Sequence, residues 1–200
     1  MSSLFSVAAI VISYFLGNIS PAILIGRAMG IDIREEGSGN AGTTNVLRVL
    51  GKRAAAATLA IDILKGVAAV FLGEYAGGQE IAMACGLAAL IGHIWPMVFQ
   101  FRGGKGIATA FGIVLALEPI LGLIEAAAAL FFMLVSQRVS VGSVAAAILL
   151  PIASYFFDPA YLPLTVAMAA IVIFKHRSNL KRLMKGEEPK VNFNRQGDKK

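Results

Sequence analysis

Long apolar segments separated by short polar linkers run along the chain. The seven segments are Leu4–Met29, Ala54–Gly73, Ile81–Phe101, Ile107–Leu117, Leu121–Ser136, Val139–Phe157 and Pro159–Phe174. Because a helix needs about 20 apolar residues to cross a bilayer, the pattern predicts an all-α, polytopic membrane protein with seven transmembrane helices. The fourth, fifth and seventh segments are short, so each is tilted, extended by its flanks, or only a partial crossing. Kinks or helix ends are expected at Gly17, Pro21, Pro96, Pro151 and Pro163.

The composition strengthens this interpretation. Hydrophobic residues make up 57% of the chain, charged residues make up 15%, and the mean hydropathy is +0.73, whereas soluble domains carry about 25% charged residues. The N-terminus has no basic region and no clear cleavage site follows the first segment, so we expect a retained helix rather than a signal peptide. A single cysteine, Cys85, excludes a disulfide within the chain. We expect one membrane domain over residues 1–190 and a basic tail over 191–200.

The linkers between the segments alternate in charge. Basic residues occupy every second linker and the C-terminal tail, and those of the linkers are Arg34, Arg48, Lys52, Arg53, Arg102, Lys105 and Arg138. The intervening linkers carry only acidic charges, at Glu74, Glu80, Glu118 and Asp158. The positive-inside rule then places the N-terminus outside and the tail in the cytoplasm. An even number of crossings would break the alternation, so the charge pattern also favours seven.

The net charge of +6 is therefore concentrated on one side of the membrane, where topology and anionic lipids account for it. No nucleic-acid-binding module and no platform of aromatic and basic residues is present, so we expect no nucleic acid as a partner. Asp62, Lys65 and Glu125 lie inside apolar segments, where ionisable groups are costly. Asp62 and Lys65 are three residues apart, and we expect them to form a structural pair on one helix face, facing the site.

The most distinctive polar run is Phe101-Arg102-Gly103-Gly104-Lys105-Gly106. Glycines have no evident packing use here, but they let a backbone approach an anion, and the lysine adds a compact positive charge. The residues from Ile107 onward predict a helix, and a helix N-terminus is itself an anion site. The run is not a Walker A motif, because Gly106 follows Lys105. It predicts a phosphate site at the membrane edge, and His93 is either part of that site or a satisfied histidine beside it.

A second polar run, Gly37-Ser38-Gly39-Asn40-Ala41-Gly42-Thr43-Thr44-Asn45, is followed by Arg48. An ordinary turn is also rich in Gly, Ser and Asn. The run nevertheless leads into a helix-like stretch, in which Asn45 and Arg48 would share a face. We therefore interpret it as a polar ligand-binding loop.

The third run, Lys175-His176-Arg177-Ser178-Asn179-Leu180-Lys181-Arg182, begins where the last apolar segment ends. In a helix, His176, Asn179 and Arg182 fall on one face, which favours a functional role over a simple topology anchor. Ser140 and Ser143 begin the sixth segment on the same side of the membrane. Ser143 is either a helix cap or a substrate contact.

Together these three runs resemble the membrane acyl-phosphate:glycerol-3-phosphate acyltransferases, the PlsY family of bacteria. The resemblance covers nearly the whole chain and includes the order of the motifs and the number of segments. It implies an enzyme of phospholipid biosynthesis in the bacterial cytoplasmic (inner) membrane, with its active site on the cytoplasmic face. Such an enzyme moves a fatty acyl group from acyl phosphate to the 1-hydroxyl of glycerol 3-phosphate. The products are lysophosphatidic acid and inorganic phosphate. We expect the enzyme to be a monomer without a metal or cofactor.

The resemblance also implies roles for residues. The activity-bearing positions are Ser38, Arg48, Lys105, His176 and Asn179. The expected substrate-binding positions are Gly37, Gly39, Asn40, Thr44, Asn45, Gly103, Gly104, Gly106 and Ser143. Glu188 is expected to be a structural partner, as are Asp62 and Lys65.

The group that takes the proton of the glycerol hydroxyl stays open at this stage. His176 is the first candidate because histidine titrates near neutrality, and the alternative is a phosphate oxygen of the substrate. Other classes fit less well. No histidine is followed by the aspartate of a His-x-x-x-x-Asp acyltransferase, and the four aspartates are scattered rather than clustered for a metal. A transporter would show internal repeats and polar groups at the membrane midplane.

Overall fold

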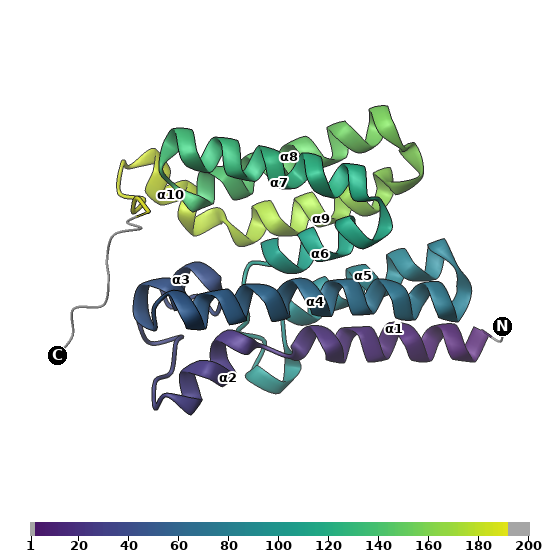
Figure 1. The fold of residues 1–200 in the computed structure, drawn as a ribbon, viewed down its shortest axis with the longest axis horizontal. Helices are drawn as coiled ribbons and strands as arrows, with labels where there is room; N and C mark the ends of the chain where they lie inside the picture. Colours follow the sequence, from purple (N-terminus) through teal and green to yellow (C-terminus); the bar gives the residue numbers. More distant parts are fainter. Residues whose placement is uncertain (1–2, 192–200) are drawn as a thin grey trace. The chain divides into compact units, whose positions relative to one another are not determined.

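The structure, a computed structural model, describes residues 3–191, and every regular element among them is a helix (Figure 1). The all-α prediction is therefore confirmed for these residues. The chain divides into two compact units, one up to Gly122 and the other from Leu123 onward. Residues 192–200 of the expected basic tail lie outside the described residues.

The three polar runs are numbered from here on in chain order: the first motif is Gly37–Arg48, the second is Phe101–Gly106 and the third is Lys175–Arg182. The first unit contains the first and second motifs. Its elements are α1 (Ser3–Asn18), α2 (Pro21–Ala28), α3 (Thr43–Val49), α4 (Lys52–Gly77), α5 (Gln79–Ile94), the 3-10 helix η1 (Met97–Phe99) and α6 (Ile107–Leu117). Helices α4 and α5 pack against each other, and each also contacts α1 and α6 (Figure 1). The helix expected from Ile107 is thus present.

The first apolar segment is broken near its C-terminal end, as predicted from Pro21. Helix α1 ends at Asn18, and α2 begins with Pro21 at its first position. Proline has no backbone N–H to donate, and its fixed φ suits the first turn of a helix. The break leaves carbonyl groups at the end of α1 that need partners inside the protein.

Glycines bring the helices of the first unit into close contact. A Cβ atom on Gly17 would collide with the backbone of Ala89, and one on Gly92 would collide with the carbonyl of Tyr14, so α1 and α5 meet through small residues. Gly112 of α6 lies equally close to Ile63 of α4. Such contacts let backbones pack where lipid provides no hydrophobic drive for association.

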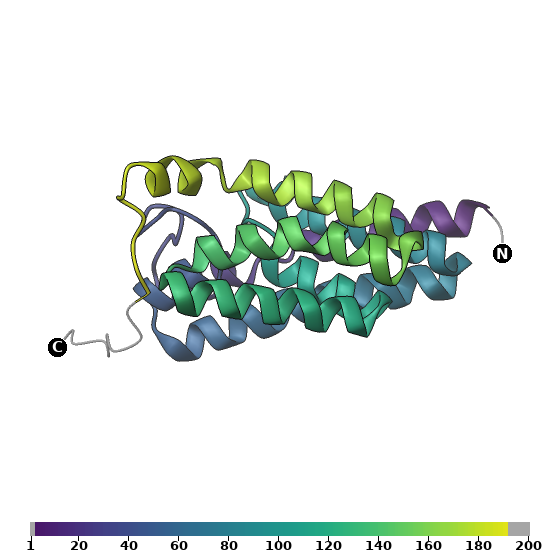
Figure 2. The same ribbon diagram turned by 90° about the horizontal axis from the view of Figure 1, so that it is seen from above.

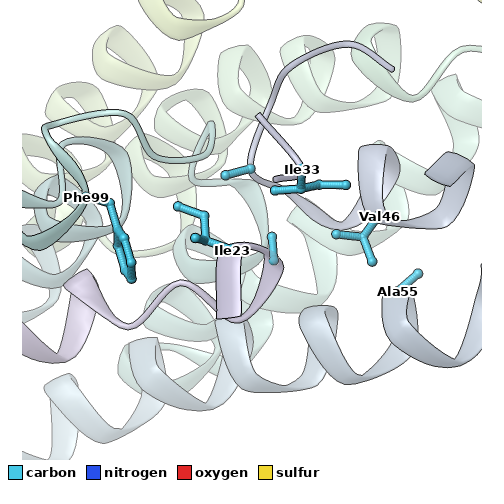
Figure 3. Packing of buried hydrophobic residues seen from close by; sticks show 7 residues of the cluster. Ile23, Ile33, Val46, Ala55 and Phe99 are labelled. Carbon is cyan, nitrogen blue, oxygen red and sulfur yellow. The ribbon is translucent and has the colours of Figure 1, made fainter. Parts of the chain in front are cut away.

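A buried apolar cluster anchors the loop that carries the first motif (Figure 3). The cluster comprises Ala22, Ile23, Ile33, Ala41, Val46, Ala55 and Phe99. These residues come from α2, α3, α4, η1 and the loop between α2 and α3, so their burial fixes that loop against the end of α4. Outside the cluster, the guanidinium of Arg27 lies 5.4 Å from the centroid of the Phe99 ring, which adds a cation–π contact.

The second unit contains the third motif. It is built from most of α7 (Pro119–Ser136), α8 (Val139–Phe157), the 3-10 helix η2 (Pro159–Tyr161), α9 (Leu162–Lys175) and α10 (Arg177–Met184). Helices α8 and α9 run side by side, and α10 turns away from α9 at His176 with a bend of 57° (Figure 2). Pro151 lies inside the continuous helix α8 rather than at an end.

Five helices are long and apolar enough to span a membrane, and the bent pair formed by η2 with α9 and α10 makes a sixth candidate among the described residues. Helix α6 has only 11 residues, which corresponds to a length of about 16 Å against a hydrocarbon core of about 30 Å. By length and composition the structure therefore supports five or six spans, and seven crossings stay a prediction.

Candidate functional site

The glycine-lysine loop packs directly against the end of α5. A Cβ atom on Gly103 would collide with the carbonyl oxygen of His93, and one on Gly104 would collide with the His93 ring. The Gly104 N–H donates to the His93 carbonyl over 3.2 Å. The expectation that these glycines have no packing use is therefore wrong, because each occupies a place that a side chain cannot share with α5.

The loop leads straight into the N-terminus of α6. Gly106 precedes the helix with φ +89°, a left-handed conformation that favours glycine. The first backbone N–H groups of α6 have no partner within the helix, and Lys105 lies half-buried just before them. A lysine beside a helix N-terminus combines positive potential with N–H donors, and these are the groups that phosphate sites in proteins use.

Two consecutive residues turn the chain back before the loop. Gln100 and Phe101 have φ of 57° and 59°, which is uncommon for residues with side chains. The Phe101 N–H donates to the Pro96 carbonyl over 2.8 Å. This turn directs the following residues back along the end of α5, and it could not be identified from the sequence because neither residue favours that conformation.

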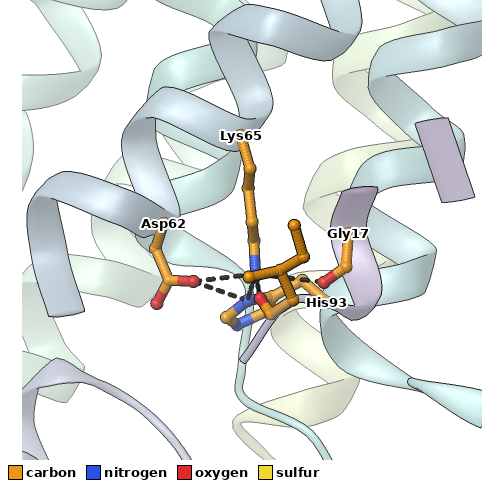
Figure 4. Close-up of polar contacts among 5 residues, drawn as sticks. Gly17, Asp62, Lys65 and His93 are labelled. Carbon is orange, nitrogen blue, oxygen red and sulfur yellow. Dashed lines mark hydrogen bonds and ion pairs between the residues drawn. The ribbon is translucent and has the colours of Figure 1, made fainter. Parts of the chain in front are cut away.

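Beneath the loop lies a buried polar cluster that joins α1, α4 and α5 (Figure 4). The Lys65 ammonium lies 2.8 Å from Asp62 Oδ1 and 2.8 Å from His93 Nδ1. It also donates to the carbonyl oxygens of Gly17 and Ile19, at 3.1 and 2.6 Å. The predicted pairing of Asp62 with Lys65 is confirmed, and the sequence did not reveal that His93 joins them.

The loop of the first motif is shaped by Asn45. The Asn45 amide donates to the carbonyls of Ile33 and Glu36 over 3.0 and 2.9 Å, and its oxygen accepts the Ser38 N–H over 2.8 Å. Its side chain is buried. Asn45 therefore holds the loop in place. Gly37, with φ +59°, lies so close to Asn45 that a side chain on Gly37 would collide with the Asn45 amide.

Several polar side chains of the first motif lie at or near the protein surface. Ser38 and Arg48 are exposed, whereas Asn40 and Thr44 are half-buried. Helix α3 places Asn45 inside and Arg48 outside, so the two residues do not face the same surroundings although they are three positions apart. Gly39 has φ +69° and lies next to the Arg34 carbonyl.

An ion pair stabilises the start of this loop. The Arg34 guanidinium donates to Asp32 over 2.9 and 2.7 Å, and the Arg34 N–H donates to the same carboxylate. The side-chain bond from Arg34 is the main reason that the pKa of Asp32 lies below its ordinary value. Both residues come from one turn, so the pair is local to the loop.

In the second unit, Glu188 organises the third motif. Its carboxylate accepts hydrogen bonds from Asn179 over 2.6 Å, from Ser140 over 2.7 Å and from Arg182 Nε over 2.7 Å. Burial opposes ionisation, but these three donors hold the pKa of Glu188 below its ordinary value of 4.5. Arg138 Nε also donates to the Glu188 carbonyl. The structure thus gives Glu188 the contacts of a structural partner and joins Asn179 with Arg182 on one face of α10.

His176 occupies the bend between α9 and α10 and is buried. Its Nδ1 lies 2.8 Å from the Val172 carbonyl oxygen. A carbonyl oxygen only accepts hydrogen bonds, so we assign the proton of the neutral ring to Nδ1. The second ring nitrogen, Nε2, then carries the lone pair, and this tautomer is the one a general base requires.

Two further polar residues of α7 and α8 lie inside the second unit. Ser143 donates to the Val139 carbonyl over 3.0 Å within its own helix, and Arg138, not Ser143, precedes the first residue of α8. Ser143 therefore does not cap the helix, and its contact with substrate stays a prediction. Glu125 is buried, and its Oε2 atom has no hydrogen-bond partner among the described residues. Among residues 3–191 as a whole, no group of three or more His, Cys, Asp or Glu side chains is placed to hold a metal ion.

Replacing Glu188 by Gln is expected to destabilise the third motif. The amide oxygen can still accept from Asn179 and Ser140, which share Oε1, but the amide NH2 cannot accept from Arg182 at the place of Oε2, and the negative charge is lost, at a cost of about 1.5–3 kcal/mol. Thermal unfolding in detergent should show a Tm lower by about 3–12 °C. Glu187→Gln changes an exposed neighbour and is the matched control.

The same comparison has a defined pH dependence. Because the folded-state pKa of Glu188 is depressed, its stabilising contribution is complete well above pH 4.5 and is lost as the pH falls through the folded-state value. The Tm difference between wild type and Glu188→Gln should therefore shrink below pH 4.5. A difference that stays constant down to the acid limit would contradict the proposed role of the carboxylate.

Comparison with known proteins gives a consistent result. The sequence model of the family described as glycerol-3-phosphate acyltransferase matches residues 7–186, which run through both units. The glycerol-3-phosphate acyltransferase of Thermoanaerobacter sp. (strain X514) is 42% identical over 191 residues, with 94% of this chain and 96% of the relative covered. That of Clostridioides difficile (strain 630) is 44% identical over 189 residues, with coverage of 90% and 93%.

Two solved structures match the fold of this chain and lead to the same family. The crystal structure of PlsY (YgiH), an integral membrane glycerol 3-phosphate acyltransferase, in its glycerol 3-phosphate form matches with a TM-score of 0.89. The identity is 32%, and the match covers 94% of this chain and 96% of that one. The lysophosphatidic acid form matches with a TM-score of 0.86 at the same identity, covering 94% and 95%. The motifs, the helical fold and these matches together show that the chain belongs to the PlsY family of integral membrane glycerol-3-phosphate acyltransferases.

Proposed function

We propose that this protein transfers a fatty acyl group from acyl phosphate to the 1-hydroxyl of glycerol 3-phosphate. The products are lysophosphatidic acid and inorganic phosphate. The observation that carries the proposal is the loop Gly103–Gly106, which places Lys105 directly before the N-terminus of α6. A lysine beside N–H groups that have no partner within their own helix suits a phosphate monoester such as glycerol 3-phosphate.

The reaction itself makes modest demands on the protein. The glycerol hydroxyl oxygen forms a bond to the acyl carbonyl carbon, the bond from that carbon to the phosphate oxygen breaks, and the phosphate departs with its electron pair. Phosphate is a good leaving group, so positioning and charge stabilisation supply most of the acceleration. The cationic groups proposed for this task are Lys105 and Arg48, with Ser38 as a further polar contact.

The proton of the hydroxyl needs an acceptor. We propose His176 Nε2, because the bond from Nδ1 to the Val172 carbonyl leaves the lone pair on Nε2. Asn179 is proposed to assist from the same face of α10, where its bond to Glu188 fixes its amide. The alternative acceptor is an oxygen of the substrate phosphate, in which case His176 orients the substrate.

We propose Gly37, Gly39, Asn40 and Thr44 as the backbone and side-chain contacts of the first motif with substrate, and Asn45 as the residue that holds them. Ser143 is proposed as a contact in the second unit. We also propose seven crossings in the bacterial cytoplasmic membrane, with the N-terminus outside and the active site on the cytoplasmic face. The charge alternation of the linkers supports this topology. The enzyme is proposed to act as a monomer within the bilayer, without a cofactor.

One measurement tests the reaction directly. The purified full-length protein in detergent or liposomes is supplied with palmitoyl phosphate and glycerol 3-phosphate, and orthophosphate and lysophosphatidic acid are quantified. We expect stoichiometric formation of both products only when both substrates are present. Acyl transfer from acyl-CoA or acyl carrier protein but not from palmitoyl phosphate would overturn the donor assignment while leaving the family assignment intact.

A further inference from the structure

The Lys65 ammonium makes four polar contacts within the first unit. Its ammonium reaches the carbonyls of Gly17 and Ile19 at the broken end of α1, Asp62 one turn earlier on its own helix, and His93 on α5 (Figure 4). The two carbonyls belong to the orphaned end of α1, where a cation is favourable. Only 4% of the Lys65 surface is exposed, so Lys65 lies inside the first unit, where it joins three helices.

Lys65 and Asp62 together hold the His93 ring. His93 Nδ1 lies 2.8 Å from Lys65 Nζ and 3.3 Å from Asp62 Oδ1. The buried pair therefore fixes the orientation of the ring from one side.

The other side of the His93 ring supports the glycine-lysine loop, Gly103–Gly106. His93 Nε2 lies against the Cα atom of Gly104, so close that a Cβ there would collide with it, and Gly103 packs on the His93 carbonyl. A bond from the Gly104 N–H to that carbonyl completes the contact. Movement of the His93 ring would therefore displace the backbone one residue before Lys105.

We infer that Lys65 is a positioning residue for acyl transfer, which acts through His93 on the Gly103–Gly104 backbone and so sets the affinity for the phosphate of the acceptor. The inference rests on the proposed function of the loop. The chain of contacts from Lys65 through His93 to Gly104 lies wholly within the first unit. Substrate does not need to touch Lys65 or Asp62 for this effect.

The test is the double variant Asp62→Asn with Lys65→Met, which removes both charges together and leaves no unpaired ion. We expect the KM for glycerol 3-phosphate to rise about ten- to 100-fold, with kcat and the KM for palmitoyl phosphate changed much less, because the loop is displaced rather than removed. Thr58→Val is the matched control. Thr58 is fully buried on α4, one turn before Asp62, and its hydroxyl donates to the Ala54 carbonyl of the same helix.

A second pair of variants keeps the inference testable if the double variant does not fold. His93→Asn retains an acceptor for Lys65 near the place of Nδ1 but removes the side of the ring that supports Gly104, so the KM for glycerol 3-phosphate should rise. His93→Gln retains a polar group near the place of Nε2 and should recover part of that loss. Equal KM values for wild type, His93→Asn and His93→Gln would overturn the inference.

Two outcomes separate this inference from the function on which it rests. If Lys105→Ala raises the KM for glycerol 3-phosphate while the double variant stays within about twofold of wild type, the loop binds phosphate and Lys65 does not position it. If Lys105→Ala leaves that KM unchanged, the proposed phosphate site itself is wrong. A double variant with a lowered Tm and an unchanged KM in its folded fraction would show a purely structural role and would also overturn the inference.

Discussion

Replacing His176 by Asn is expected to lower kcat by about 100- to 10,000-fold, which is the usual contribution of a positioned general base. Asn keeps an N–H donor near the place of Nδ1, so the bond to the Val172 carbonyl at the bend between α9 and α10 can persist. It has no counterpart of Nε2. The variant therefore removes the proton acceptor while preserving the local fold, and KM values for both substrates should change little.

The comparison is made at saturating concentrations of palmitoyl phosphate and glycerol 3-phosphate, with orthophosphate release as the readout. Arg177→Gln is the control because Arg177 is exposed beside His176 and its guanidinium lies over the Phe174 ring, 4.6 Å from its centroid. A kcat for His176→Asn within about threefold of wild type would exclude the histidine base. The substrate phosphate would then be the acceptor of the proton.

The helical class of this fold could be predicted from hydropathy alone, but the number of spans could not. Length and apolar content identify α4 and α8 without ambiguity. The sequence cannot decide whether the short segment Ile107–Leu117 crosses, since its 11 helical residues are bounded by Gly106 and Pro119. Periodicity reports local structure, whereas a crossing depends on what surrounds the helix.

Among the site residues, too, contacts within one helix could be predicted from the sequence, whereas contacts between helices could not. Asp62 and Lys65 could be paired from their spacing, because positions three apart on a helix are neighbours. His93 could not be added to them, because it comes from α5 and meets Lys65 only through the packing of three helices. The available signal was a histidine in one apolar segment and a lysine in another, since both side chains need polar partners at that depth.

Glycine was the residue that the sequence explained least well. Gly103 and Gly104 fit a phosphate-binding loop by type, but the structure shows that their lack of a side chain is needed to pack on His93. The two explanations are compatible, since a backbone pressed against α5 has fixed N–H groups. One pattern of glycines thus carries both packing and chemistry, and only contacts can separate them.

Replacing Lys105 by Ala is expected to raise the KM for glycerol 3-phosphate by about ten- to 150-fold, because a hydrogen bond to a charged group contributes about 1.5–3 kcal/mol. The effect should fall on this substrate rather than on palmitoyl phosphate if the loop holds the acceptor. Arg102→Ala removes an exposed positive charge from the same segment, three residues away, and is the control for general electrostatics. Its smaller effect should disappear in high salt, whereas the effect of Lys105→Ala should persist because a half-buried contact is screened less. An increase confined to the KM for palmitoyl phosphate would instead place the phosphate of the donor on this loop and would contradict the assignment of glycerol 3-phosphate to it.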